Sequence, residues 1–146
     1  MELKVKRLPH FEGELPKYET AGASGFDVRA QIGHDIHILP GKRVIVPTAL
    51  AFEIPEGYEL QSRPRSGRAL KEGLSITNTP GTIDADYRGE VSVQLINHDK
   101  EEVISIKPQE RVCQLVLCPV VQAELVEYKT LTPTVRGYNG HGSTGS

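Results

Sequence analysis

Short apolar or alternating segments recur between turn residues, and this recurrence constrains the fold more than any other feature of the chain. The 146 residues include 14 glycines and 10 prolines, and turn pairs such as Pro40-Gly41 and Pro80-Gly81 separate the segments. Such segments without long helical patterns indicate short strands, which pack as a sandwich or close as a barrel. The sequence therefore predicts an all-β fold.

The expected strands follow from their alternation and from the turns between them. Val91, Val93 and Leu95 alternate with polar residues, so they should share one buried face. Only residues 66–71 suggest a helical turn, which Ser66 could cap. We expect strands at residues 3–8, 26–32, 43–46, 50–54, 58–62, 74–77, 90–97, 103–106, 111–121 and 124–128.

Length and charge narrow the class of protein. The chain is long enough for one domain with its own core. A formal net charge of −2 argues against a nucleic-acid partner, although a local arginine cluster could still bind a small anion. No apolar run reaches about 18 residues and the first residues lack a signal-peptide pattern, so we expect no membrane partner and a cytoplasmic location. Cys113 and Cys118 form no metal-binding pattern, and their odd separation on one expected strand places them on opposite faces.

The composition shifts near Thr130. Residues 136–146 are mainly glycine and polar residues, which can bury almost nothing. A segment of this kind should be mobile on its own. We therefore expect a folded domain at residues 1–130 and a mobile C-terminal arm at residues 131–146.

The first candidate site piece is Pro64-Arg65-Ser66-Gly67, at the start of the expected helical turn. Backbone N–H groups at a helix start attract phosphate, and glycine lets the backbone come close to it. An ordinary capped turn with a surface arginine explains the same residues, and such turns are common. Taken alone, this piece favours the structural interpretation.

A second piece runs from Asn78 to Gly89 and places two aspartates and Tyr87 before an expected strand. Asn78 followed by Pro80-Gly81 is typical of a loop or hairpin. A carboxylate such as Asp84 beside a phosphate site can act as a general base or hold a metal, and a tyrosine ring offers a flat face to a sugar or base. A polar turn with solvated carboxylates explains these residues equally well.

The remaining pieces are weaker. Arg136 and the glycines of the arm could wrap phosphates, and His141 could stack on a base, but a C-terminus without function is the more common outcome. Asp27 follows a glycine-containing turn. Gln114 lies within an apolar segment, where a buried amide is usually structural.

Together, and in this order, the pieces resemble the five motifs of the homotrimeric dUTP diphosphatase family. The resemblance runs from about Leu15 to the end of the chain, and its third and fifth motifs are long and specific. It implies a distorted jelly-roll or β-barrel, and a homotrimer in which all three subunits build each active site. The motifs are Ala23-Ser24-Gly25-Phe26-Asp27, Pro64-Arg65-Ser66-Gly67, residues 81–89, Arg111-Val112-Cys113-Gln114-Leu115 and residues 136–145.

The resemblance implies hydrolysis of dUTP to dUMP and pyrophosphate, which keeps uracil out of DNA and supplies dUMP for thymidylate synthesis. Asp84 would orient and deprotonate the water that attacks the α-phosphorus. Mg²⁺ would sit mainly on the triphosphate oxygens, and Asp27 would reach it through water.

The resemblance also implies how the nucleoside is recognised. Asn78 and the backbone of Gly81, Thr82 and Ile83 would recognise the uracil edge, rejecting cytosine and a 5-methyl group. Tyr87 would lie under the deoxyribose and leave no room for a 2′-hydroxyl.

Phosphate contacts would come from the second motif, from the fourth motif and from the arm. His141 would cover the base as the arm closes over a neighbouring subunit's site. The residues assigned to the phosphates are Arg65, Ser66, Gly67, Gln114, Arg136, Gly142, Ser143 and Thr144.

Three residues depart from the family pattern. His141 stands where phenylalanine is most common, and an imidazole still stacks but can titrate. Asn139 replaces a usual glycine, and asparagine tolerates left-handed backbone better than most residues. Gln109 replaces a turn glycine, which puts the geometry of that turn in doubt.

Two other functions fit parts of the pattern. A dCTP deaminase would share the fold, but such enzymes tend to be longer and to differ at the segment matched by residues 84–87. A jelly-roll that binds nucleotides or serves a structural role without catalysis is disfavoured by the presence of Asp84 and a complete arm.

Overall fold

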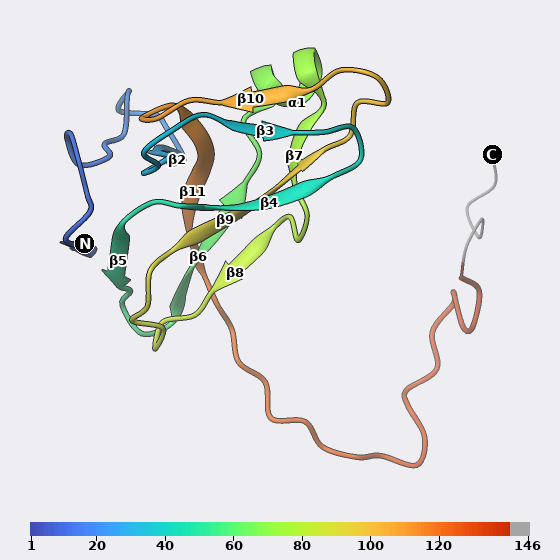
Figure 1. Cartoon of the computed structure of the whole chain (residues 1–146). Coiled ribbons are helices and arrows are strands. Elements are labelled where there is room, and N and C mark those ends of the chain that lie inside the picture. Colours follow the sequence, from blue (N-terminus) through green and yellow to red (C-terminus); the bar gives the residue numbers. More distant parts are fainter. Residues whose placement is uncertain (141–146) are drawn as a thin grey trace.

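Within residues 1–140 the regular secondary structure is mainly antiparallel strand, and one short helix lies at one end of the domain (Figure 1). The computed structural model describes residues 1–140. The strands are β1 (Lys4–Arg7), β2 (Gly25–Arg29), β3 (Ile36–Ile38), β4 (Arg43–Pro47), β5 (Leu50–Glu53), β6 (Tyr58–Arg63), β7 (Leu74–Ile76), β8 (Gly81–Ile83), β9 (Ser92–Asn97), β10 (Ile104–Ile106) and β11 (Arg111–Pro119), and the helix is α1 (Ser66–Glu72).

Two sheets form the body of the domain. The larger has the strand order β2-β11-β6-β8 and the smaller β4-β9-β7, and every neighbouring pair is antiparallel. Two further antiparallel pairs join β1 to β5 and β3 to β10. Neighbours in these sheets are mostly distant in sequence, as the crossing connections of a jelly-roll require. Since none of the sheets formed by residues 1–140 closes on itself, the fold is the expected distorted jelly-roll and not a closed barrel.

The apolar faces of the sheets share one core. Val93 and Leu95 of β9 are 1% and 0% exposed, and Val91 immediately before them is 3% exposed, so the predicted alternation is confirmed. Leu60 of β6 and Leu115 of β11 belong to the same buried cluster. Each such side chain contributes about 1.5–3 kcal/mol by leaving water.

Most expected strands are confirmed, but the strand expected at residues 124–128 is wrong. Residues 120–140 are exposed and belong to no strand or helix. An alternating segment forms a strand only where another backbone pairs with it, and the described part of this chain supplies no such partner. The sequence also failed to predict β3 and β8, because pairing with the distant strands β10 and β6, and not a local pattern, makes these short segments strands.

The helical turn is confirmed as α1, but Ser66 does not cap it. The N-cap position falls on Arg65, whose side chain makes no capping hydrogen bond. Ser66 is already inside the helix, so its hydroxyl is not at the position from which a cap acts. Gly73 ends the helix in a left-handed conformation, and its N–H donates to the carbonyl of Ala69 at 3.1 Å.

Gln109, which replaces a glycine of the family pattern in the turn before β11, adopts a left-handed backbone conformation with φ of 63°. Its N–H donates to the carbonyl of Ala30 at 2.9 Å, and its side-chain amide donates to Oε1 of Gln31 at 2.9 Å. Arg29 in turn donates to the carbonyl of Gln109 at 2.7 Å. These contacts hold a conformation that glycine would adopt without strain.

Cys113 and Cys118 both lie on β11 and differ in exposure, as their odd separation predicts. Cys113 is buried, Cys118 is partly exposed, and neither forms a disulfide. Burial raises the pKa of the Cys113 thiol to about 12, so this thiol packs as a small apolar group.

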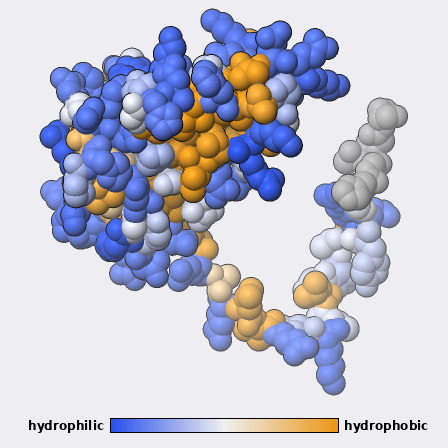
Figure 2. Space-filling view, in the orientation of Figure 1, coloured by the Kyte–Doolittle hydropathy of each residue, from blue (hydrophilic) through white to orange (hydrophobic). Residues whose placement is uncertain are grey.

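After β11 the chain leaves the domain. Figure 1 shows the segment running away from the sheets, and Figure 2 shows apolar side chains along it and on the face around β4, β9 and β7. Ile45 on β4 is 63% exposed, and Val121 and Leu125 in the segment are 95% and 96% exposed. Large apolar side chains left in water on a single chain mark surfaces that a partner can cover. Within residues 1–140, no helix is long and apolar enough to span a membrane.

Candidate functional site

The second sequence piece lines a cavity of about 350 Å³, which we call the β8 cavity. It lies where β8, at the edge of one sheet, meets residues of β4 and β9 in the other. All six site residues expected between Asn78 and Tyr87 line it. Its lining residues are Ile45, Ser62, Asn78, Gly81, Thr82, Ile83, Asp84, Tyr87, Glu90, Val91, Ser92 and Gln94.

The connection from Asn78 to Gly81 is a loop that changes sheets, and the alternative of a hairpin is wrong. β7 pairs with β9, whereas β8 pairs with β6. The Thr79-Pro80 peptide within this loop is cis. A hairpin would have paired β7 with β8, but each strand finds a longer partner in a different sheet, and the cavity lies between the two.

Gly81 is required by the close approach of two side chains. A Cβ atom at this position would overlap Oγ of Ser62 and would lie 3.1 Å from Nδ2 of Asn78. Ser62 stands directly opposite Gly81 in the β6–β8 pairing. Glycine therefore lets the backbone of β8 form this wall of the cavity without displacing the Ser62 hydroxyl.

Asp84 lies in a turn at the end of β8. The N–H of Tyr87 donates to the carbonyl of Asp84 at 3.1 Å, and Arg88 braces the turn by donating to the carbonyl of Ala85 at 2.6 Å. The side chain of Asp84 is exposed, and no hydrogen bond or ion pair engages its carboxylate within residues 1–140. This carboxylate therefore stands unpaired, within the described residues, at the rim of the β8 cavity.

Tyr87 folds back over Gly89. Its hydroxyl donates to the carbonyl of Glu90 at 3.0 Å, and a Cβ atom at Gly89 would overlap the ring. The ring is 47% exposed and borders the β8 cavity. A tyrosine fixed at both its hydroxyl and its face presents a defined surface to a ligand.

The first sequence piece lines a different cavity of about 530 Å³, which we call the turn cavity. It combines the first turn of α1 with side chains of β2 and β11. Of the expected site residues, Asp27, Arg65, Ser66, Gly67 and Gln114 border it.

Asp27 is held by two arginines. Arg65 Nε lies 3.1 Å from Asp27 Oδ2, and Arg111 Nη1 lies 3.5 Å from the same oxygen. Arg111 also reaches Glu19 at 2.9 Å, which ties the segment before β2 to the turn cavity. Arg65 has five N–H donors, so the pairing with Asp27 leaves others for an anion.

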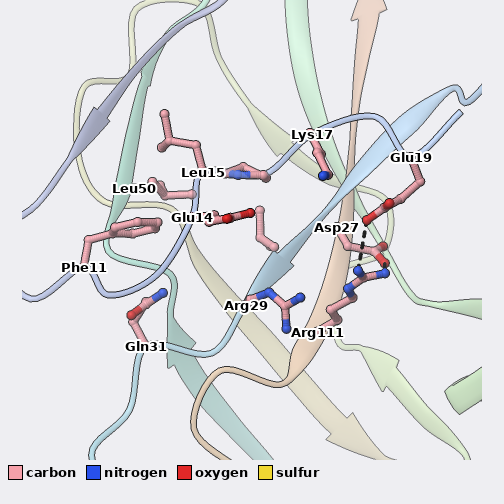
Figure 3. A pocket seen from close by; sticks show the side chains of 12 residues that line it. Phe11, Glu14, Leu15, Lys17, Glu19, Asp27, Arg29, Gln31, Leu50 and Arg111 are labelled. Carbon is pink, nitrogen blue, oxygen red and sulfur yellow. Dashed lines mark hydrogen bonds and ion pairs between the residues drawn. The ribbon is translucent and has the colours of Figure 1, made fainter. Parts of the chain in front are cut away.

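Figure 3 shows this chain of charges from Glu19 through Arg111 to Asp27, at the side of a smaller cavity of about 190 Å³. Arg111 was part of a sequence motif without an assigned role, and only its place between two carboxylates gives it one. Ser62, which faces Gly81, gave no signal in the sequence because its partner lies on another strand.

The two cavities lie apart on one chain. Gly81, Ser62, Leu115 and Phe26 are successive partners across the sheet. Three strand spacings of about 4.8 Å put Gly81 about 14 Å from Phe26, the neighbour of Asp27. The chain itself therefore brings the expected site residues together in two groups and does not join them.

The arm joins neither group within the described residues. Arg136 is exposed and donates from Nε to the carbonyl of Asn139 at 3.0 Å, in the segment that runs away from the domain (Figure 1). The expected contacts of His141, Gly142, Ser143 and Thr144 fall outside the residues that the structure describes.

The described residues contain no group of three or more histidine, cysteine, aspartate or glutamate side chains arranged to hold a metal ion. Within the described residues, Asp27 is the acidic residue of the expected site that lines the turn cavity. Its carboxylate is already engaged by arginines, which suits contact with a hydrated cation better than direct ligation.

Comparisons with known proteins agree on one family. A family model described as dUTPase matches residues 12–145. The deoxyuridine 5′-triphosphate nucleotidohydrolase of Bdellovibrio bacteriovorus is 55% identical over 145 residues, covering 99% of this chain and 97% of that protein. Its counterpart from Chlamydia pneumoniae is 55% identical over 135 residues, covering 92% of each chain.

Solved structures agree on the fold. The dUTPase of Staphylococcus bacteriophage 80alpha, solved with dUpNHpp, matches with a TM-score of 0.86 and 25% identity over 99% of both chains. A dUTPase from phage phi11 of S. aureus, described as coordinating a structural Mg(II) ion, matches with a TM-score of 0.78 and 22% identity over 89% of this chain and 98% of that one.

Proposed function

Because the chain belongs to the dUTPase family, we propose that it hydrolyses dUTP to dUMP and pyrophosphate through attack of water on the α-phosphorus. The observation that carries the proposed mechanism is the free carboxylate of Asp84 at the rim of a cavity with a backbone wall. Its relatives carry the name of this activity, and the residues of the β8 cavity give it a chemical basis.

Uracil binds in the β8 cavity. Asn78 and the backbone of Gly81, Thr82 and Ile83 present fixed donors and acceptors to the base edge, which suit uracil and reject cytosine. The close packing of Gly81 against Ser62 supports a narrow cavity with no space for a 5-methyl group.

Tyr87 lies under the deoxyribose. The bond from its hydroxyl to the carbonyl of Glu90 and the contact of its ring with Gly89 support a fixed ring. A fixed ring discriminates against an added 2′-hydroxyl because it cannot move aside at low cost.

Asp84 orients the attacking water and accepts its proton. A general base must be within hydrogen-bond reach of the water and must have its carboxylate available. The absence of a competing partner for Asp84 within residues 1–140 supports this role.

The phosphates bind at the turn cavity. Arg65 supplies charge, Ser66 and Gly67 offer backbone N–H groups, and Gln114 lies near the α-phosphate. A bound Mg²⁺ would be held mainly by the phosphate oxygens and would supply charge neutralisation at the leaving pyrophosphate. Asp27 faces the same cavity and would contact that ion through water.

Complete sites require more than one copy of the chain, and we infer a homotrimer. The separation of the β8 cavity from the turn cavity supports sites shared between subunits, and so do the exposed apolar residues on the face around β4. The arm at residues 131–146 closes over a neighbouring site, with Arg136 at the γ-phosphate, His141 on the base and residues 142–144 around the phosphates. A cytoplasmic location, where nucleotides are made, stays a prediction.

The deciding experiment measures pyrophosphate release from dUTP with Mg²⁺ by the full chain and by Asp84→Asn. We expect the substitution to lower kcat by about 10²–10⁴, because a general base typically contributes that factor. Asp86→Asn is the matched control, since it removes the other exposed carboxylate of the same turn, and it should keep activity.

Two outcomes would contradict the proposal. If the wild-type chain and Asp84→Asn are equally inert with dUTP, the protein is not this enzyme. If dCTP yields ammonia while dUTP yields no pyrophosphate, the chain is a deaminase on the same fold.

A further inference from the structure

Helix α1 carries the phosphate-binding turn but has little of its own to hold it in place. It is only seven residues long, none of its residues is buried, and the side chain of its N-cap residue makes no capping hydrogen bond. A helix this short is unstable in water without tertiary contacts. Some other contact must therefore fix the turn at residues 65–67.

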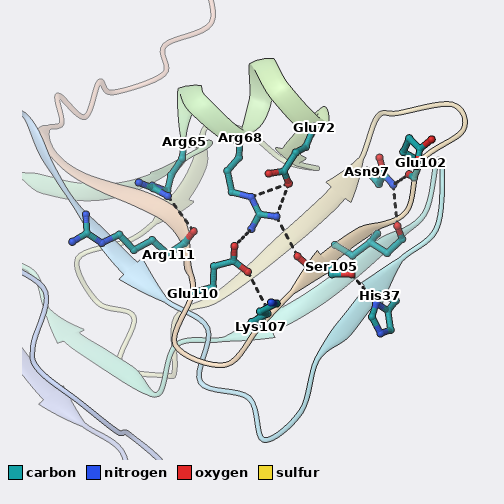
Figure 4. Close-up of polar contacts among 11 residues, drawn as sticks. His37, Arg65, Arg68, Glu72, Asn97, Glu102, Ser105, Lys107, Glu110 and Arg111 are labelled. Carbon is teal, nitrogen blue, oxygen red and sulfur yellow. Dashed lines mark hydrogen bonds and ion pairs between the residues drawn. The ribbon is translucent and has the colours of Figure 1, made fainter.

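Arg68 makes that contact. Its Nε and Nη2 donate to Glu72 Oε2 at 3.0 and 2.6 Å within α1, and Nη2 also donates to the carbonyl of Ser105 on β10 at 3.2 Å (Figure 4). Its Nη1 lies 3.0 Å from Glu110 Oε1, in the turn before β11. One guanidinium thus bridges the helix, a strand and a turn.

Glu110 is itself held by the backbone, so the contact between Arg68 and Glu110 joins α1 to a fixed side chain. Its Oε2 accepts a hydrogen bond from the backbone N–H of Lys107 at 2.9 Å, while Oε1 faces Arg68. The Nη1 atom of Arg68 is buried and makes no hydrogen bond within residues 1–140, so its contact with Glu110 is coulombic. Its strength depends on both charges remaining in place.

Arg65 and Arg68 differ in what they can do. The side chain of Arg65 is 33% exposed, whereas that of Arg68 is 11% exposed and lies between two carboxylates. A guanidinium committed to two carboxylates and a carbonyl cannot also bind substrate without leaving buried charge unpaired. Arg68 borders the turn cavity, but its donors point at protein.

We propose that Arg68 is a positioning residue for phosphate binding. It pins α1 to β10 and to the turn before β11, and it thereby places Arg65, Ser66 and Gly67 to meet the β- and γ-phosphates. This inference rests on the proposed function, because it assumes that the turn cavity receives the triphosphate. Without the contacts of Arg68, residues 65–67 would still be present, but they would no longer be held in the fixed geometry on which phosphate contacts depend.

The test compares Arg68→Met with Arg7→Met, using the full chain. Arg7→Met is the matched control, because it makes the same change at an exposed arginine on β1, far from both cavities in sequence, whose guanidinium lies over the Phe11 ring. We expect Arg68→Met to raise KM for dUTP about tenfold, the effect of losing one charge-assisted contact, and to leave kcat within about twofold. The inhibition constant of dUMP, which lacks the β- and γ-phosphates, should also stay within about twofold.

Rescue and a second variant complete the design. Arg68→Lys keeps one charge but cannot span both carboxylates, so its KM should fall between wild type and Arg68→Met. If Arg68→Met does not fold, Glu110→Gln keeps the pair with Glu72 and should raise KM about threefold.

Unchanged KM in Arg68→Met, or in Glu110→Gln where the first does not fold, would overturn the inference. So would equal losses of dUTP and dUMP affinity, which would indicate a general structural role. Failure of the wild-type chain to hydrolyse dUTP would count against the proposed function instead.

Discussion

The β8 cavity and the turn cavity are held in shape by different kinds of interaction. The β8 cavity is walled by strand backbone and fixed by close contacts, such as Gly81 against Ser62 and Tyr87 against Gly89. The turn cavity is held by ion pairs, in which Arg65 and Arg111 share Asp27 and Arg68 joins two glutamates.

This difference fits the ligand that we propose for each cavity. A neutral base is distinguished by shape and by fixed hydrogen-bond groups, which a paired sheet supplies without charge. A triphosphate is bound by charge, and arginines held by carboxylates are positioned before it arrives. We therefore expect the β8 cavity to be sensitive to single atoms and the turn cavity to be sensitive to charge and salt.

Among these variants, we expect the largest effect from removing the end of the arm, which we propose closes over a site built from the cavities of neighbouring subunits. Truncation after Arg136 should lower kcat/KM on the order of 10³-fold, comparable with the loss of preorganised donors to the reacting phosphate. The truncated chain should keep its fold and assembly, because the removed residues have almost nothing to bury. Sedimentation and thermal unfolding would check this, and a monomeric or unfolded product would show that the arm is structural.

Gly81→Ala should be the most damaging single-atom change in the β8 cavity. The added methyl would overlap Ser62 Oγ, so we expect kcat/KM for dUTP to fall about 10²-fold through misplacement of the base. Adding Ser62→Ala to the same chain removes the overlapping oxygen and should restore part of the activity. Steady-state kinetics of the three variants test this, and absence of any rescue would show that another contact sets the requirement for glycine.

Arg65→Met should affect the turn cavity through binding. We expect KM for dUTP to rise roughly tenfold, since one charged contact to phosphate is lost. The wild-type KM should also rise between about 0.05 and 0.5 M salt, and that rise should be smaller in Arg65→Met, because screening weakens charged contacts. The same salt dependence in both chains would mean that Arg65 does not face the phosphates.

The smallest effect concerns Cys113, which neighbours Gln114 of the turn cavity on β11. Because burial raises its pKa from 9.0 to about 12, its thiolate population in the folded chain falls by about a thousandfold. Iodoacetamide at pH 8 should therefore leave Cys113 unmodified and activity unchanged until urea unfolds the chain. Mass spectrometry of the labelled peptides checks this, and alkylation of Cys113 in the folded chain would contradict the prediction.

Much of the fold was predictable, and the failures share a cause. The alternation at Val91, Val93 and Leu95 placed β9 because half of each strand faces the core. Alternation also suggested a strand at residues 124–128, where no partner strand exists in the described chain. A sequence pattern reports which face could be buried, but pairing decides whether a strand forms.

The candidate site shows the same division. The residue types alone left Asp84 equally well explained as a solvated turn carboxylate, and only the resemblance carried by the order of the five motifs indicated a nucleoside triphosphate and a role for Asp84. No local pattern predicts that Arg65 and Arg111 pair with Asp27, or that Ser62 faces Gly81, because these partners are distant in the chain.

By itself, the sequence determined the all-β class and the buried faces of the long strands, since these follow from local pattern, and its motifs indicated the family. Only the tertiary structure decided that β7 and β8 enter different sheets, that Arg68 secures α1, and that the site residues lie in two separate cavities. Strand pairing and buried charge join residues far apart in the chain, and no local pattern records those distances.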